Sequence, residues 1–176
     1  MAQFIETMNV GGAEHLAVTV ANALAGRGCA SHLIVATGPG PLSGRIDPAV
    51  RVHYLGFVRA SVRNPLAFAW SVSKGLRRLG GIVRQEGIEV AQTHLPGANF
   101  WGLVLALRGV CGVVATVHNN EEFRYGAHDN RVLRAARRAA YGQIVRRCGV
   151  VAVSAAVKES LVRQLRLDGA LAARIA

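Results

Sequence analysis

The residues whose types and spacing most clearly suggest a functional role are two adjacent glycines, Gly11 and Gly12. They lie between an apolar stretch and a predicted helix. Glycines in such a loop allow the backbone to approach a phosphate, and the amino terminus of the following helix attracts anions. The alternative interpretation is that the two glycines only allow a tight turn with a positive φ. The dinucleotide fingerprint G-x-G-x-x-G is not present, because the next glycine after Gly12 is Gly26. The pair is therefore a candidate phosphate loop of another kind.

Two histidines end apolar stretches elsewhere in the chain. His118 ends GVVATVH and opens a loop of amides and carboxylates, with Asn119, Asn120 and Glu121. A polar cleft is the natural setting for such a residue, so His118 is a candidate site residue. His94 ends IEVAQTH and fits either a ligand contact or a buried histidine whose hydrogen bonds are satisfied. No third ligand is evident near the two histidines, so no metal is expected.

Two further polar residues stand at predicted helix starts. Glu14 lies in the first turn of its helix, where a carboxylate more often compensates the helix dipole than acts in catalysis. Ser154 precedes the last long helix and is suited to cap it. Both are kept as possible site residues.

These residues fall on a regular alternation of strands and helices. Strands are predicted over residues 2–7, 50–55, 88–94, 112–118 and 149–154, and another within 27–37 after a turn at Gly28. Helices are predicted over residues 12–27, 65–85, 98–107, 129–147 and 154–167. The paired Gly80 and Gly81 are expected to weaken the second helix locally and kink it.

This order predicts one α/β domain over residues 1–176, with a Rossmann-like doubly wound parallel sheet. Near-continuous apolar strands are typical of a parallel sheet that helices cover on both faces. Ligands bind such sheets at the carboxyl ends of the strands. The usual strand order places the first strand beside the fourth and the fourth beside the fifth. Gly11, Gly12, His94 and His118 are then expected to line one crevice.

The charge balance indicates an anionic partner or an arginine-rich coding bias. The net charge is +11, and 19 of the 21 basic residues are arginine. Arg131, Arg134 and Arg138 share a face of the predicted helix 129–147. This face is either a solvent-exposed outer face or a surface that contacts an anionic membrane. Nucleic acid is not expected, because no stacking platform, zinc finger or helix-turn-helix accompanies the charge. Three scattered cysteines and the absence of a basic leader favour the cytoplasm.

Four segments carry a resemblance to a known family. NVGGAEHLAVTVANALAGRGCASHLIVAT, IEVAQTHLPGANFWGLVLAL, VVATVHNNEE and VVAVSAAVKESLV occur in the order seen in the amino-terminal domain of family 4 glycosyltransferases of the GT-B type. The resemblance covers nearly the whole chain. It implies retaining transfer of a hexose from a nucleotide-sugar donor to an envelope lipid or polysaccharide acceptor, with no cofactor and without a bound metal.

The resemblance also implies roles for the residues. Gly11 and Gly12 would lie beside the diphosphate and sugar of the donor, and His118 would be the catalytic residue near the transferred sugar. The acceptor-facing residues would be His94, Asn119, Asn120 and Glu121. Glu14 and Ser154 remain possible contributors. The enzyme would be cytoplasmic, with possible peripheral contact to the inner face of the membrane.

The family pattern continues where this chain stops at AARIA, and its E-x7-E motif has no counterpart here. We therefore expect a carboxyl-terminal donor-binding domain that this chain lacks, an inactive fragment, and an exposed apolar edge around Phe123 and Tyr125. A GT-B-like sugar-nucleotide epimerase and a non-enzymatic module that binds anionic membranes remain alternatives. A nicotinamide oxidoreductase is disfavoured, because the second predicted strand ends in IVATGPG without an acidic residue.

Overall fold

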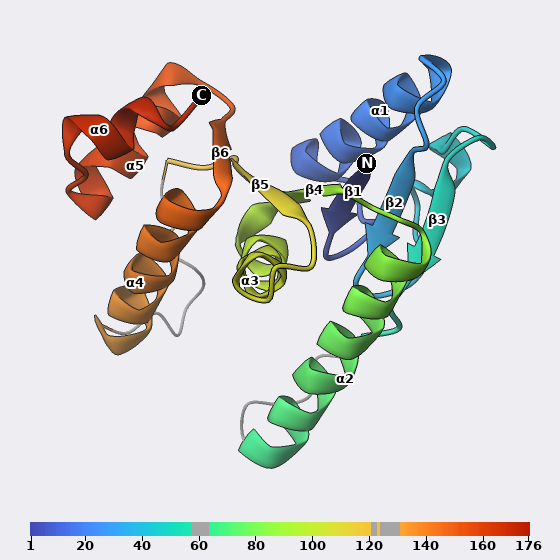
Figure 1. Ribbon diagram of the computed structural model, residues 1–176, viewed down its shortest axis with the longest axis horizontal. Coiled ribbons are helices and arrows are strands. Elements are labelled where there is room, and N and C mark those ends of the chain that lie inside the picture. Colours follow the sequence, from blue (N-terminus) through green and yellow to red (C-terminus); the bar gives the residue numbers. More distant parts are fainter. Residues whose placement is uncertain (58–63, 121–122, 124–130) are drawn as a thin grey trace.

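The computed structural model describes residues 1–57, 64–120, 123 and 131–176 (Figure 1). Its strands are β1 (Ala2–Ile5), β2 (His32–Val35), β3 (Arg51–Tyr54), β4 (Val90–His94), β5 (Gly112–Val117) and β6 (Gly149–Ala152). Its helices are α1 (Gly12–Gly26), α2 (Pro65–Gln85), α3 (Leu95–Leu107), α4 (Arg131–Arg147), α5 (Ala155–Leu165) and α6 (Gly169–Ala173). A 3-10 turn, η1, covers Ser43–Arg45.

All six strands are parallel and follow the order β3-β2-β1-β4-β5-β6. This is the doubly wound Rossmann-like arrangement, in which the strand order reverses beside the first strand. The predicted fold class is therefore confirmed, as is the expectation that β4 lies between β1 and β5. The carboxyl ends of these three central strands meet at one edge of the sheet.

Alternation along the strands divides the core between the two faces of the sheet. Ile5, Leu33 and Val35 pack with α1 on one face. Phe4 and Ile34, which point the other way, belong to a larger cluster with residues of α2, α3, α4 and α5. Figure 1 shows α1 apart from α2, α3 and α4, with the sheet between them.

Three elements differ from the prediction. Helix α3 begins directly after His94 rather than at residue 98, because Pro96 fits the first helical turn. Leu95, before this proline, has a left-handed φ of 71°. Helix α2 runs through Gly80 and Gly81 as one continuous helix. The short helix α6, capped by the Asp168 side chain, was not predicted.

A buried amide joins three elements behind the sheet edge. Asn99 of α3 is fully buried. Its Nδ2 donates to the Thr116 carbonyl of β5 and to the Tyr141 hydroxyl of α4, each at 3.1 Å. Its Oδ1 accepts from the Thr93 hydroxyl of β4 at 2.7 Å. All three contacts are with groups that water does not reach freely, so the amide fixes α3 against both strands.

We expect Asn99→Ala to lower the free energy of unfolding by about 3 kcal/mol, because it leaves several buried polar groups without partners. Urea denaturation measures this loss. The matched control is Asn119→Ala, which removes an exposed amide and is expected to change the free energy by less than about 0.5 kcal/mol. Equal effects of the two variants would contradict the role given to the buried network.

Candidate functional site

The carboxyl edge of the sheet brings the predicted residues together. His94 is the last residue of β4, His118 follows β5, and Gly11 caps the amino terminus of α1 after the β1 loop. His94 is fully buried, whereas His118 is half-buried. The Nδ1 atom of His94 lies 3.2 Å from Nε2 of His118, so the two rings are in direct contact.

A second hydrogen bond fixes the protonation pattern of this pair. Nε2 of His94 lies 2.7 Å from Oε1 of Gln3, a fully buried residue of β1. With the Gln3 amide oxygen assigned to face His94 as an acceptor, the His94 proton lies on Nε2 and its Nδ1 accepts from Nε2–H of His118. This leaves Nδ1 of His118 as an acceptor. In this orientation Nε2 of Gln3 is buried without a hydrogen-bond partner among the described residues. Gln3 has no family motif around it, so sequence reasoning missed its part in the site.

Burial keeps both histidines neutral. Burial, with a smaller contribution from the neighbouring His118, lowers the pKa of His94 to about 3. Burial also lowers the pKa of His118, although the Glu14 carboxylate opposes this shift. A neutral His118 held by a buried neighbour can make a directed hydrogen bond without first losing a proton.

The two glycines of this loop are not needed for a left-handed turn. Gly11 has a φ of −154°, and Gly12 lies within α1, so neither requires a positive φ. The Glu14 carboxylate fills the space that a Cβ atom on Gly11 would occupy, whereas the space around Gly12 is open. Thr7 donates a hydrogen bond to this carboxylate at 3.4 Å. Glu14 therefore faces the sheet edge, and an anion beside Gly11 requires its side chain to turn away.

The predicted acceptor loop is only partly described. Asn119 and Asn120 are exposed, and the Asn120 carbonyl accepts hydrogen bonds from Ser160 and Gln164 of α5, both at 2.6 Å. Glu121 lies outside the described residues. Ser154 accepts a hydrogen bond from the Val157 amide at 3.3 Å and caps α5, which is the structural role that its position suggested.

The expected apolar edge at Phe123 is wrong. Phe123 is 1% exposed and packs edge-on against Tyr141, with ring centroids 5.2 Å apart. Tyr125 lies outside the described residues. Among the described residues, exposed large apolar side chains include Val10, directly before Gly11, and Val153, directly after β6. Others lie on α2, at Leu66 and Trp70, and on α4, at Val132. Sequence reasoning missed the burial of Phe123 because its partner on α4 follows 18 residues later.

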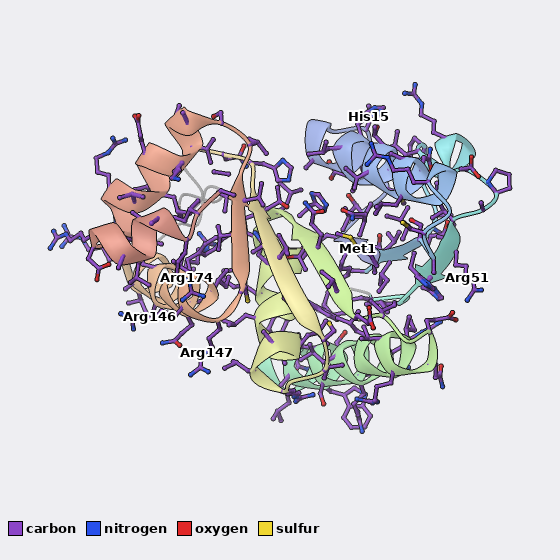
Figure 2. All side chains as sticks on the ribbon, turned by 45° about the horizontal axis from the view of Figure 1, so that its top comes forward. Met1, His15, Arg51, Arg146, Arg147 and Arg174 are labelled. Carbon is purple, nitrogen blue, oxygen red and sulfur yellow. The ribbon has the colours of Figure 1, made fainter. Side chains whose placement is uncertain are left out.

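The arginines of α4 reach the surface unevenly. Arg131 and Arg138 are exposed, and Arg134 is half-buried. At the far end of the helix, Arg146 and Arg147 lie near Arg174, whose guanidinium donates to the Arg146 carbonyl at 3.0 Å (Figure 2). Within the described part of the chain, no helix combines the length and apolarity needed to cross a membrane.

An apolar cavity of about 290 Å³ lies close to the same sheet edge. Phe57, Phe68 and Trp101 line it with other residues of α2 and α3, and Glu6, which follows β1, also lines it. The Glu6 carboxylate fills the space that a side chain on Gly97 would need. No local sequence motif predicts this cavity, because its aromatic residues are far apart in the sequence.

Comparison with solved structures finds the same fold within longer proteins. The chain superposes on sucrose-phosphate synthase from Thermosynechococcus elongatus with a TM-score of 0.69 and 15% identity, over 93% of this chain and 44% of that one. It superposes on Anabaena HepE, solved in complex with UDP and glucose, with a TM-score of 0.66 and 15% identity, over 99% of this chain and 42% of that one. The chain thus spans less than half the length of either protein.

Fold and sheet edge together define a Rossmann-like domain of the GT-B type. The sequence model of Glycosyltransferase Family 4 matches residues 10–175, and the chain belongs to this family. The match includes Gly11, Gly12, His94 and His118. No curated protein sequence matches the chain.

Proposed function

We propose that this chain is the acceptor-side domain of a retaining glycosyltransferase that moves a hexose from a nucleotide-sugar donor to an envelope lipid or polysaccharide. The family match over residues 10–175 carries this proposal. It is supported by the position of Gly11 and His118 at the edge where such sheets bind ligands. The UDP and glucose in the similar HepE structure favour a donor of that class.

In the proposed reaction the bond between the sugar and the departing diphosphate breaks, an acceptor oxygen forms a new bond to the same sugar carbon, and the proton of the acceptor hydroxyl passes to the departing diphosphate. The open backbone at Gly12 and the amino terminus of α1 would stabilise the diphosphate, once Glu14 has turned away. His118 would accept a hydrogen bond from a sugar hydroxyl through Nδ1, and His94 and Gln3 would hold its ring. Rate enhancement would come from positioning and electrostatic stabilisation.

The cavity beside Glu6 supports an acceptor with an apolar portion. Its aromatic lining suits a lipid segment, and the carboxylate that also lines it can accept a hydrogen bond from an acceptor hydroxyl. Asn119 and Asn120 would contact the acceptor from the neighbouring loop. Contact with an anionic membrane through Arg131 and Arg138 would present such an acceptor at the inner face.

Product analysis with the whole protein tests the reaction. A radiolabelled nucleotide sugar is supplied with a lipid extract, and label that moves into a lipid or polysaccharide fraction supports transfer. An epimerised sugar nucleotide would favour the epimerase instead. Sedimentation with anionic liposomes at low and high salt, without any turnover, would favour the membrane-binding module.

The donor should bind this chain only weakly. We infer that a second domain of the whole protein holds most of the donor, since the chain spans 44% and 42% of the two similar structures. Calorimetric titration of the 176-residue chain with UDP-glucose is therefore expected to give a Kd on the order of 1 mM, or about −4 kcal/mol. A micromolar Kd would contradict this division between the domains.

A further inference from the structure

Three potential metal ligands converge away from the site described above, on the other side of β1. They are His32 of β2, His53 of β3 and Glu86, which follows α2. One ligand atom from each lies within 4.8 Å of the other two. The closest approach joins Nδ1 of His32 and Nε2 of His53 at 3.2 Å, and the two rings are stacked.

The fold explains why these residues meet. His32 pairs with Arg51 across the parallel strands, and His53 lies two residues beyond Arg51. Residues two apart on a strand share a face, so both imidazoles point to the face that α2 covers. Arg51 also forms an ion pair with Glu86 at 2.8 Å, and one oxygen of this carboxylate lies within 4.8 Å of a ring nitrogen of each histidine.

We propose that His32, His53 and Glu86 form a binding site for Zn²⁺ or a similar divalent transition metal. Two imidazole nitrogens on a tetrahedral zinc ion, each at about 2.0–2.1 Å from the metal, are separated by roughly 3.3 Å. The observed 3.2 Å matches this separation. Two imidazoles and one carboxylate are a donor set that zinc accepts, with a fourth position left for water.

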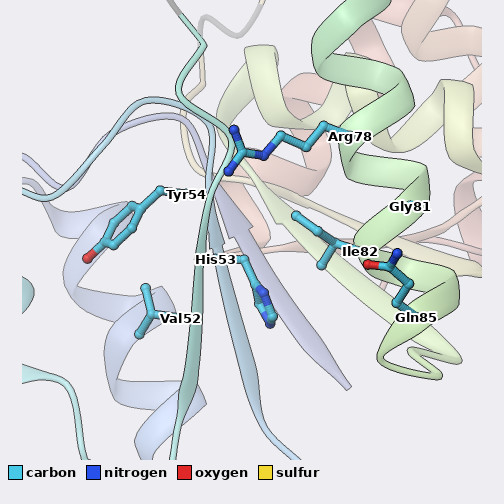
Figure 3. A pocket seen from close by; sticks show the side chains of 7 residues that line it. All are labelled: Val52, His53, Tyr54, Arg78, Gly81, Ile82 and Gln85. Carbon is cyan, nitrogen blue, oxygen red and sulfur yellow. The ribbon is translucent and has the colours of Figure 1, made fainter.

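The protonation and access of the site fit this assignment. Burial lowers the pKa of both histidines, and the Arg51 hydrogen bond lowers the pKa of Glu86, so all three groups are in the form that binds metal. His53 also lines a cavity of about 490 Å³ between β3 and α2, together with Arg78 and Gln85 (Figure 3). This cavity offers an entry path and room for the water ligand.

Two positive charges oppose the metal. The amino group of Met1 and the Arg51 guanidinium both lower the pKa of His32, and they repel a cation in the same way. Arg51 also competes for Glu86. However, its side chain is 67% exposed, and such an ion pair is weak enough for the carboxylate to change partners. The competing explanation is a pair of neutral imidazoles that share one hydrogen bond and bind no metal.

Metal titration of the chain itself tests the site. Metal-free protein with Cys29→Ser, which removes an exposed thiol, is titrated with Zn²⁺ against a chromophoric chelator and with Co²⁺ by visible absorption. We expect one ion per chain, a submicromolar Kd for Zn²⁺, and cobalt bands typical of a tetrahedral site. No binding would overturn the proposal, and it would leave the proposed transferase function unaffected, because the test requires no turnover.

Four variants locate the ion. His53→Ala is expected to weaken binding by at least about 100-fold, because even loss of an outer-shell partner costs 10- to 100-fold. Glu86→Gln, at a half-buried helix end, should also weaken it by about tenfold or more and alter the cobalt bands, and it serves if His53→Ala fails to fold. Arg51→Ala is expected to tighten binding by up to about fivefold, since Glu86 is freed. His15→Ala, on α1 and apart from Arg51 (Figure 2), should change nothing. Unchanged affinity in both His53→Ala and Glu86→Gln would place the ion elsewhere and overturn the assignment.

Discussion

In the whole protein with the proposed transferase activity, replacing His118 by alanine is expected to lower kcat by about 100- to 1000-fold, the usual cost of losing one preorganised transition-state hydrogen bond. The half-buried ring is fixed on one side by His94, which Gln3 holds in turn. A hydrogen bond that such a ring accepts needs no reorientation of the ring during the reaction. Steady-state kinetics on the variant and the parent protein measure the effect.

The same preparation separates catalysis from stability. His118→Ala leaves Nδ1 of His94 without its donor, which should cost about 1 kcal/mol and lower Tm by roughly 2–4 °C. His15→Ala serves as a control for removing a histidine from the neighbouring helix. A folded His118→Ala protein with full turnover would remove this residue from the site, and a large loss of Tm with normal turnover would assign it to the core.

Acidification is expected to destabilise the chain well before the carboxylates titrate. The pKa of His94 is about 3 in the folded protein and about 6.5 when unfolded, so the unfolded state binds the proton more readily. Stability from this group is complete above pH 6.5 and falls as the pH drops toward 3. The loss from His94 alone is about 2 kcal/mol at pH 5. The lowered pKa values of His32, His53 and His118 act in the same direction.

Urea denaturation at pH 8 and pH 5 measures this linkage. The midpoint should fall clearly on acidification in the parent chain. His94→Gln, which removes the most strongly shifted group, should be less stable at pH 8 but lose less between the two pH values. Equal midpoints for the parent chain at both pH values would show that His94 is not held neutral by the fold.

The sequence predicts most of the fold because the strands are short apolar runs that alternate with longer helical segments. The doubly wound order then follows from the crossover rules, and it brings Gly11, His94 and His118 to one edge. The apolar pattern predicts element boundaries less well where the backbone conformation of a single residue sets the boundary. Leu95, with its positive φ, starts α3 three residues early, and no periodicity indicates this.

The side-chain contacts of the site are mostly beyond sequence reasoning. Gln3 reads as an ordinary polar residue in a strand, and only the parallel register with β4 places it beside His94. His32 and His53 read as isolated histidines in two strands, and Glu86 as a helix end. Their convergence depends on which faces the strands present to α2, which local pattern does not specify.

The place of β1 in the sheet also sets an order of events during synthesis. Its first partner, β2, follows about thirty residues later, but its second partner, β4, begins only at Val90. At translation rates of about 5–20 residues per second, one edge of β1 waits roughly 4–17 s for its partner. During this interval α1, β1, β2 and β3 can already assemble around their own small core. The hydrogen bonds that join Gln3, His94 and His118 can form only after β4 and β5 have been synthesised. The nascent chain therefore completes its candidate site late, after β1, β2 and β3 have assembled.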